Sequence, residues 1–230
     1  MGRKKTRDSK LVAQLSPKSP VTEAYRILRT NIQFMGVDAP IKTIAITSSG
    51  PQEGKSTTVG NLGITMAQAG SRVLMVDCDL RKPTLHRVFS SSGMMGITNV
   101  LRGDCGLLEA VQNTRIEDLQ LLTTGPLPPN PVELLNSERM KALIGEMKEA
   151  FDMVLFDTPP ANALADAAIL SSMLDGTILV IDHGQVTPQS AQRAKELLVN
   201  AKARILGVVL GNIPMDGSDS YYYYYYYGKS

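Results

Sequence analysis

The sequence predicts an α/β fold in which helices cover both faces of a doubly wound, mostly parallel sheet. Short β-branched runs alternate with longer stretches of helical periodicity along most of the chain. Such alternation is typical of a parallel sheet with crossover helices. The strand-like runs are apolar without regular polar alternation, as expected for a sheet covered on both sides. The chain has 230 residues, 43% of them hydrophobic, which is enough for one substantial core.

One folded domain over residues 19–215 is predicted between two polar tails. Residues 1–18 begin with a basic cluster and are interpreted as a flexible tail, with contact to an anionic membrane surface as the alternative. Residues 216–230 start with a Gly/Ser/Asp linker and are predicted to be a second flexible tail. The net charge of only +2 does not indicate a nucleic-acid partner. No signal peptide or membrane-spanning run is visible, so we expect a cytoplasmic protein.

The first predicted element of the domain is a helix over residues 19–35. Ser19 is a favourable N-cap residue, and Pro20 fits the first helical turn. Apolar residues then recur at helical spacing at Tyr25, Leu28, Ile32 and Met35.

The remaining elements alternate along the chain. Strands are predicted at 43–47, 72–76, 119–123, 153–156, 177–181 and 205–210. Helices are predicted at 57–69, 138–150, 163–174 and 188–201. Between the second and third strands, residues 84–118 are interpreted as an irregular excursion with short helices.

A glycine-containing loop joins the first strand to the helix at 57–69. This context presents backbone N–H groups to phosphate oxygens. Gly54 lets the backbone approach, Lys55 can reach the β- and γ-phosphates, and the hydroxyl of Ser56 can contact Mg²⁺. The strict GxxxxGK[ST] pattern would place glycine where this chain has Ser49, so the first turn of the loop must be built differently. The predicted nucleotide-binding residues of this P-loop are Gly50, Gly54, Lys55, Ser56 and Thr57.

Three aspartates follow two of the predicted strands. Asp77 and Asp79 end the strand at 72–76, and Asp157 ends the strand at 153–156. Ligands bind beyond the carboxyl ends of strands in open α/β sheets, so these carboxylates can serve metal binding and base catalysis. A single aspartate here could simply cap a helix, but three beside a phosphate loop favour a site. The basic pair Arg81-Lys82 either stabilises charge on a transferring phosphoryl group or belongs to a solvated loop, and the sequence does not favour one.

Together these motifs resemble the bacterial tyrosine kinases of capsule and exopolysaccharide synthesis, in the Gram-positive arrangement where the kinase is a separate cytoplasmic chain. The resemblance covers nearly the whole sequence. Besides the phosphate loop, it rests on the segments 23–31 (EAYRILRTN), 77–83 (DCDLRKP), 125–131 (GPLPPNP) and 156–160 (FDTPP), and on the terminal tyrosine run.

The resemblance implies binding of ATP with Mg²⁺ and phosphorylation of tyrosine by a P-loop fold. Lys55 would hold the phosphates, and Ser56 and Asp157 would serve the metal site. Asp77 and Asp79 would share metal contact and activation of the tyrosine hydroxyl, with the identity of the base left open. Asn212 resembles an adenine-side position.

The resemblance also implies partners. Glu23, Arg26 and Arg29 lie three residues apart on one helix face, where an intrahelical ion pair is the simpler interpretation. The family pattern instead implies a homo-oligomeric ring through this segment. It further implies a membrane activator whose cytoplasmic tail docks on the kinase, protein tyrosine substrates, and an opposing phosphotyrosine phosphatase.

Seven consecutive tyrosines near the end of the chain cannot all be core residues. A flexible tail could reach the active site of a neighbouring subunit, so we expect autophosphorylation in trans that regulates capsule or exopolysaccharide synthesis. The expected acceptors are Tyr221, Tyr222, Tyr223, Tyr224, Tyr225, Tyr226 and Tyr227.

Two other functions compete with this interpretation. A partitioning or positioning ATPase would share the fold, but its signature lysine falls where this chain has Gly50, and it lacks a tyrosine tail. A nucleotide-binding regulatory module without turnover would need defective acidic residues, and none of the acidic motifs is missing.

Overall fold

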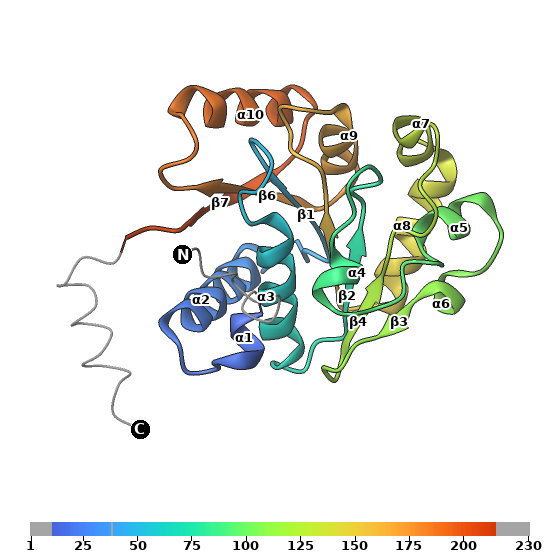
Figure 1. Ribbon diagram of the computed structural model, residues 1–230, viewed down its shortest axis with the longest axis horizontal. Helices are drawn as coiled ribbons and strands as arrows, with labels where there is room; N and C mark the ends of the chain where they lie inside the picture. Colours follow the sequence, from blue (N-terminus) through green and yellow to red (C-terminus); the bar gives the residue numbers. More distant parts are fainter. Residues whose placement is uncertain (1–10, 38, 215–230) are drawn as a thin grey trace, which may run out of the picture.

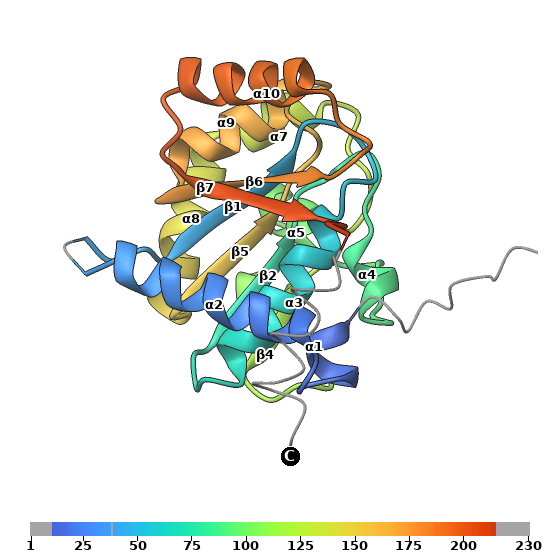
Figure 2. The same ribbon diagram turned by 90° about the vertical axis from the view of Figure 1, so that its left-hand side faces the viewer.

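The computed structural model describes residues 11–37 and 39–214, and within them a seven-stranded sheet lies between two layers of helices (Figures 1 and 2). The strand order is β3-β4-β2-β5-β1-β6-β7, and every neighbouring pair is parallel except β3 with β4. The predicted fold class is therefore confirmed. The strands are β1 (Thr43–Ser48), β2 (Val73–Asp77), β3 (Gln112–Asn113), β4 (Leu119–Leu122), β5 (Met153–Asp157), β6 (Gly176–Asp182) and β7 (Ile205–Gly211).

Ten helices occur among the described residues. They are α1 (Val12–Leu15), α2 (Pro20–Met35), α3 (Lys55–Ala67), α4 (Leu85–Val88), α5 (Ile97–Arg102), α6 (Leu107–Ala110), α7 (Pro131–Leu135), α8 (Glu138–Ala150), α9 (Ala165–Met173) and α10 (Pro188–Asn200). Every predicted strand and long helix is present, with ends within two residues of those expected. The excursion over 84–118 contains α4, α5, α6 and the short strand β3, as the irregular pattern indicated.

The two faces of the sheet follow from the alternation of side chains along each strand. On β2, Leu74 and Val76 pack into the core beneath α8 and α9. Val73 and Met75 point the other way and pack with the residues of α2 and α3. Because both sets are apolar, the strand has no polar face, which explains the uninterrupted apolar runs in the sequence.

The amino-terminal boundary of the domain differs from the prediction. Residues 12–15 form α1, although the sequence placed them in a tail ending at residue 18. Ala13 is fully buried, and its backbone N–H donates to Oδ1 of Asn61 on α3 at 2.8 Å. The predicted boundary was therefore too late, because a four-residue helix is too short to show helical periodicity.

The helix α2 begins as predicted. The side chain of Ser19 accepts a hydrogen bond from the backbone N–H of Thr22, and Pro20 occupies the first turn. No helix among the described residues has both the length and the apolar character needed to cross a membrane.

Candidate active site

The phosphate loop connects β1 to α3, as predicted. Gly54 is the residue before α3 and has φ 91° and ψ 13°, in the left-handed region. A Cβ at this position would meet nothing within 4 Å. Glycine is therefore favoured here by backbone conformation rather than by lack of space.

The first turn of the loop is built around a carboxylate. The hydroxyl of Ser49 donates to Oε1 of Glu53 at 2.7 Å, and the backbone N–H of Gly50 donates to the same oxygen. Ser49 and Glu53 are 2% and 5% exposed. The serine that replaces the expected glycine thus supports the turn through its side chain. Glu53 was not among the predicted site residues, although its position four residues after this serine was an available signal.

The carboxyl ends of adjacent strands bring the predicted acidic residues to the loop. Asp77 at the end of β2 and Asp157 at the end of β5 are register partners. Both are fully buried, and the hydroxyl of Ser56 donates to Oδ2 of Asp157 at 2.5 Å. Lys55 is also nearly buried, at 9% exposure, and its charge acts on Asp157. The structure therefore places Lys55, Ser56, Asp77 and Asp157 together.

Burial changes the proton affinity of both aspartates. Desolvation, reinforced by the charge of Asp77, raises the pKa of Asp157 to about 8, although Lys55 and the hydrogen bond from Ser56 oppose the rise. Desolvation also raises the pKa of Asp77 to about 6, with backbone hydrogen bonds opposing it. Both carboxyl groups therefore favour their protonated forms more than an exposed aspartate does, unless a cation binds beside them.

The residues around Ser56 suit a divalent cation that also binds phosphate. Oδ1 of Asp157 is buried and has no hydrogen-bond partner among the described residues. A cation there would satisfy this oxygen and favour the ionised carboxylates. No group of three or more His, Cys, Asp or Glu side chains within residues 11–37 and 39–214 is arranged to hold a metal ion by itself. Mg²⁺ typically uses only one or two carboxylates together with phosphate oxygens and water, so the arrangement fits Mg²⁺ bound with a nucleotide.

The segment after β2 supports these groups through its backbone. Oδ2 of Asp77 accepts hydrogen bonds from the N–H groups of Thr84 and Leu85, each at 2.9 Å. Oδ1 of Asp79 accepts from the N–H of Lys82 at 2.9 Å and from that of Arg81 at 3.4 Å. The hydroxyl of Thr84 lies 2.6 Å from that of Ser56. Thr84 was not among the predicted site residues, since a lone threonine near the DxD motif carries no distinguishing signal.

The basic pair after Asp79 matches neither sequence interpretation completely. The Nε of Arg81 donates to Oδ2 of Asp166 in the first turn of α9, at 3.2 Å. The side chain of Arg81 is 40% exposed and that of Asp166 is fully buried. Arg81 is therefore tied to a second element rather than lying in a solvated loop. Lys82 is exposed, and no hydrogen bond or ion pair of its side chain occurs among the described residues.

Asn212 lies apart from this cluster. It follows β7 with φ 55°, and its side-chain amide donates to Oδ1 of Asp182, at the end of β6, at 2.8 Å. Asp182 is 2% exposed. The strands β6 and β7 lie on the opposite side of β1 from β5 and β2. Asn212 thus borders the carboxyl edge of the sheet on the other side of the phosphate loop, and Asp182 is a neighbour that sequence analysis did not identify.

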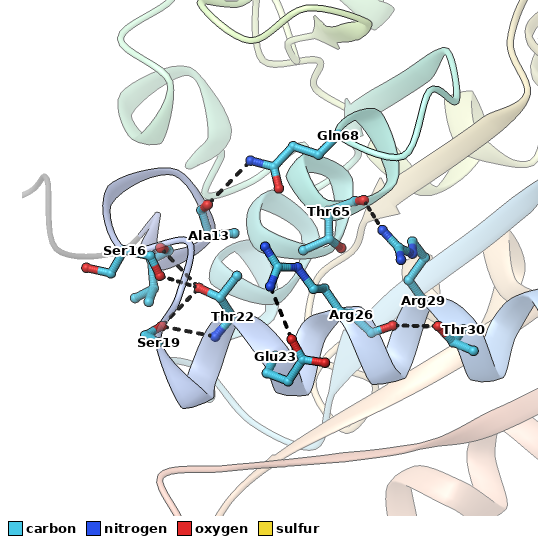
Figure 3. A network of polar contacts seen from close by, with 11 residues as sticks. Ala13, Ser16, Ser19, Thr22, Glu23, Arg26, Arg29, Thr30, Thr65 and Gln68 are labelled. Atoms are coloured by element: carbon cyan, nitrogen blue, oxygen red, sulfur yellow. Dashed lines mark hydrogen bonds and ion pairs between the residues drawn. The ribbon is translucent and has the colours of Figure 1, made fainter. Parts of the chain in front are cut away.

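The three charged residues of α2 do not act alike (Figure 3). Arg26 folds back on Glu23, with Nη1 and Oε2 3.1 Å apart, as in the simple intrahelical pair. Arg29 points toward α3 and donates to the backbone oxygen of Thr65 at 2.7 Å. Arg29 therefore joins α2 to α3 within the subunit. The predicted acceptors, Tyr221 to Tyr227, lie outside the described residues.

Comparison with known proteins gives these features a family context. A family model described as "AAA domain" matches residues 41–203. The chain is 44% identical over 225 residues to "Tyrosine-protein kinase YwqD" of Bacillus subtilis, covering 96% of this chain and 95% of that protein. The solved structure of the chimerical protein CapA2B2 has a TM-score of 0.87 and 37% identity, covering 90% of this chain and 91% of that one. The kinase domain of Escherichia coli tyrosine kinase ETK has a TM-score of 0.86 and 30% identity, covering 90% of this chain and 82% of that one.

A septum site-determining protein shares the fold, with lower structural similarity and lower sequence identity. The septum site-determining protein MinD of Pyrococcus horikoshii, solved with Mg-ADP, has a TM-score of 0.64 and 24% identity, covering 79% of this chain and 76% of that one. Similarity at this level shows a common fold and nothing more. The identity with YwqD, in contrast, extends over nearly the full length of both proteins, and the chain therefore belongs to the family of bacterial tyrosine-protein kinases.

Proposed function

We propose that this chain uses ATP and Mg²⁺ to phosphorylate tyrosine hydroxyls, including those of Tyr221 to Tyr227, in trans between subunits. The observation that carries this proposal is the cluster of Lys55, Ser56 and Asp157 beside the phosphate loop, with Oδ1 of Asp157 left without a partner among the described residues. The family to which the chain belongs supports tyrosine as the acceptor.

Each residue of the cluster has a role that its position supports. The loop N–H groups and Lys55 bind and orient the phosphates of the nucleotide, with Gly50, Gly54 and Thr57 shaping the loop. Ser56 and Asp157 would hold the metal, which would neutralise phosphate charge when bound, and Asp77 would support this metal site from the neighbouring strand. Asn212 contributes on the adenine side of the site.

Asp79 is the better candidate for the base. Both oxygens of Asp77 already accept backbone hydrogen bonds, from Asp79, Thr84 and Leu85, and Asp77 is fully buried. Asp79 retains 9% exposure at the edge of the cluster. The raised pKa of Asp77 would suit a base, but reach to the substrate is the first requirement. In the transfer, the bond from the γ-phosphorus to the leaving oxygen of ADP breaks, a bond to the tyrosine oxygen forms, and the tyrosine proton passes to Asp79.

The proposed function includes partners and a setting. We expect a homo-oligomeric ring that presents the tail of one subunit to the site of the next. A membrane protein would bind the kinase through its cytoplasmic tail and keep this otherwise cytoplasmic chain at the membrane. A phosphotyrosine phosphatase would reset the tail, and the cycle would regulate capsule or exopolysaccharide synthesis. The curated relatives support this setting only in general terms.

Mass spectrometry of the purified chain after incubation with Mg-ATP tests the function. We expect phosphates between Tyr221 and Tyr227 in the wild type and none in Lys55→Met, because the phosphates lose their cationic anchor. Lys42→Met is the matched control, since Lys42 precedes the same strand that the loop follows, and its ammonium donates to a surface carbonyl. Parallel samples would include the cytoplasmic tail of a membrane protein encoded beside the kinase. Release of ADP with an unmodified tail in all samples would instead favour a positioning-type ATPase.

A further inference from the structure

A short segment touches most of the proposed catalytic groups at once. We define the strap as residues 79–85, which follow β2 and end at the first residue of α4. Its backbone N–H groups bind the carboxylates of Asp77 and Asp79, and the hydroxyl of Thr84 contacts that of Ser56 at 2.6 Å and Oδ2 of Asp157 at 3.5 Å. A shift of the strap would therefore change the orientation of both proposed catalytic aspartates and of the metal-binding pair.

Besides the buried side chains of Leu80 and Leu85, which pack into the two cores, the strap has a polar side-chain anchor outside this cluster. The Nε of Arg81 donates to Oδ2 of Asp166 on α9, 85 residues along the chain. The helix α9 follows the loop that leaves β5 after Asp157. The pair thus connects the segment after β2, which ends in Asp77, with the segment after β5, which ends in Asp157.

Asp166 is a costly residue to bury without a function. Its side chain is fully buried, Oδ2 is bonded by Arg81, and Oδ1 has no hydrogen-bond partner among the described residues. Buried carboxylates are strongly destabilising unless they are paired, so the pairing with Arg81 is what makes this position tolerable. Asp166 lies in the first turn of α9, where the helix dipole stabilises its negative charge. An apolar residue would nevertheless pack there at a lower free-energy cost.

We propose that Arg81 and Asp166 are positioning residues for phosphoryl transfer: their ion pair anchors the strap, so that Asp79 and Thr84 keep their orientation toward the bound phosphates and metal. This inference rests on the proposed kinase function. Neither residue touches the reacting atoms. Their effect is transmitted through the strap backbone, and small displacements of catalytic groups reduce turnover strongly.

The same two strands supply a matched control. At their amino ends, Nη2 of Arg72 and Oδ1 of Asp152 form an ion pair of 2.9 Å just before β2 and β5. Both side chains are largely exposed, at 58% and 47%. The pair Arg72–Asp152 therefore links the same strands at the opposite edge of the sheet, away from the strap.

Four variants separate positioning from simple stability. Arg81→Ala leaves a buried unpaired carboxylate and should lower the melting temperature. Asp166→Asn leaves only the part-exposed Arg81 unpaired and should lower it less. The double variant removes both charges and should restore the melting temperature toward the wild type. Arg81→Lys keeps a cationic donor and should retain part of the activity.

Two readouts decide the proposal. We expect kcat for tail phosphorylation to fall about tenfold or more in Arg81→Ala, Asp166→Asn and the double variant, with KM for ATP changed by less than about threefold. Hydrogen exchange of the strap amides should accelerate in the same variants. Arg72→Ala and Asp152→Asn should change neither readout.

Two results would overturn the proposal. One is a double variant that regains both the melting temperature and the kcat of the wild type, since the pair would then act on stability alone. The other is unchanged exchange of the strap amides in all variants. If wild-type protein phosphorylates no tyrosine, the proposed function fails, and the exchange experiment still decides separately whether the pair anchors the strap.

Discussion

At the scale of single residues, two aspartates at opposite ends of β5 show how environment sets chemistry. Asp152 precedes the strand, is exposed, and has its pKa lowered by hydrogen bonds from Arg72. Asp157 ends the strand, is fully buried, and has its pKa raised to about 8. The same side chain is therefore a stable surface anion at one end and a group that favours its proton at the other, unless a cation binds beside it.

The raised pKa of Asp157 predicts a stability that depends on pH in metal-free protein. An unfolded aspartate releases its proton near pH 3.8, whereas the folded protein keeps this proton until about pH 8. Between these values the folded state binds more protons, so its stability falls as the pH rises. Asp77 adds to this fall in stability up to about pH 6, the value to which its pKa is raised. Asp157→Asn should remove the contribution of Asp157 to this loss of stability with rising pH.

Thermal unfolding in EDTA from pH 5 to pH 8 measures this effect. We expect the melting temperature of Asp157→Asn to exceed that of the wild type by an amount that grows with pH. Asp152→Asn is the control, because its lowered pKa lies below this range and its difference from the wild type should stay constant. A difference for Asp157→Asn that does not vary with pH would contradict the burial argument.

At the scale of elements, the phosphate loop and α8 contain two glycines with opposite structural meaning. Gly54 has φ 91°, while Gly145 lies within the helix α8 without a positive φ. A Cβ at either position would meet nothing within 4 Å. Steric fit is therefore equal at the two sites, and only the backbone conformation differs.

Alanine substitutions should reveal this difference. Gly54→Ala should destabilise the protein by about 1–2 kcal/mol, the cost of a left-handed conformation, and weaken ATP binding because the loop N–H groups shift. Gly145→Ala should stabilise it by about 0.5–1 kcal/mol, because alanine reduces the entropy lost in a helix interior. Urea unfolding gives both free energies, and calorimetry gives the ATP affinity. Equal effects of the two substitutions would refute the conformational explanation.

Several short elements escaped prediction for a common reason. The helices α1 and α7 have four and five residues, and β3 has two. None is long enough to display a period of 3.6 or 2 residues. The long elements, in contrast, contain several turns or a complete apolar run, so their positions could be read from the sequence to within two residues.

At the scale of the whole molecule, α2 holds the residues that the family resemblance links to ring formation. Arg29 donates to the backbone oxygen of Thr65 within the subunit, whereas the side chains of Glu23 and Arg26 are part-exposed and, among the described residues, bond only to each other. An exposed pair of this kind contributes about 0–1 kcal/mol to stability. Arg26 can therefore exchange its partner for one on a neighbouring subunit at small cost.

Arg26→Ala should therefore change assembly but not folding. We expect an unchanged melting temperature and a shift from oligomer to monomer in light scattering. Lys141→Ala breaks the equivalent pair with Glu138 on α8, at the same helical spacing, and should leave the assembly intact. Wild-type protein that remains monomeric at high concentration, or an Arg26→Ala variant that assembles normally, would contradict a ring formed through this segment.

The candidate site was predictable only in part. The loop residues and the three aspartates could be identified because each follows a strand and has a recognisable local pattern. Glu53 was missed although its contacts with Ser49 and Gly50 are local, whereas Thr84 and Asp166 could not be identified, because their importance lies in contacts that the local sequence does not encode. The contact between Thr84 and Ser56 spans 28 residues, and that between Arg81 and Asp166 spans 85.

The sequence by itself determined the order of strands and helices, the phosphate loop and the edge of the sheet where the acidic residues gather. These features depend on local periodicity, turn chemistry and the direction of parallel strands. Only the tertiary structure decided which side chains are desolvated and what they contact. Burial raises the pKa values of Asp77 and Asp157. Arg81 pairs with Asp166 on α9, and Arg29 donates to the backbone of α3. Burial and long-range hydrogen bonds arise when distant segments pack together, so no local pattern specifies them.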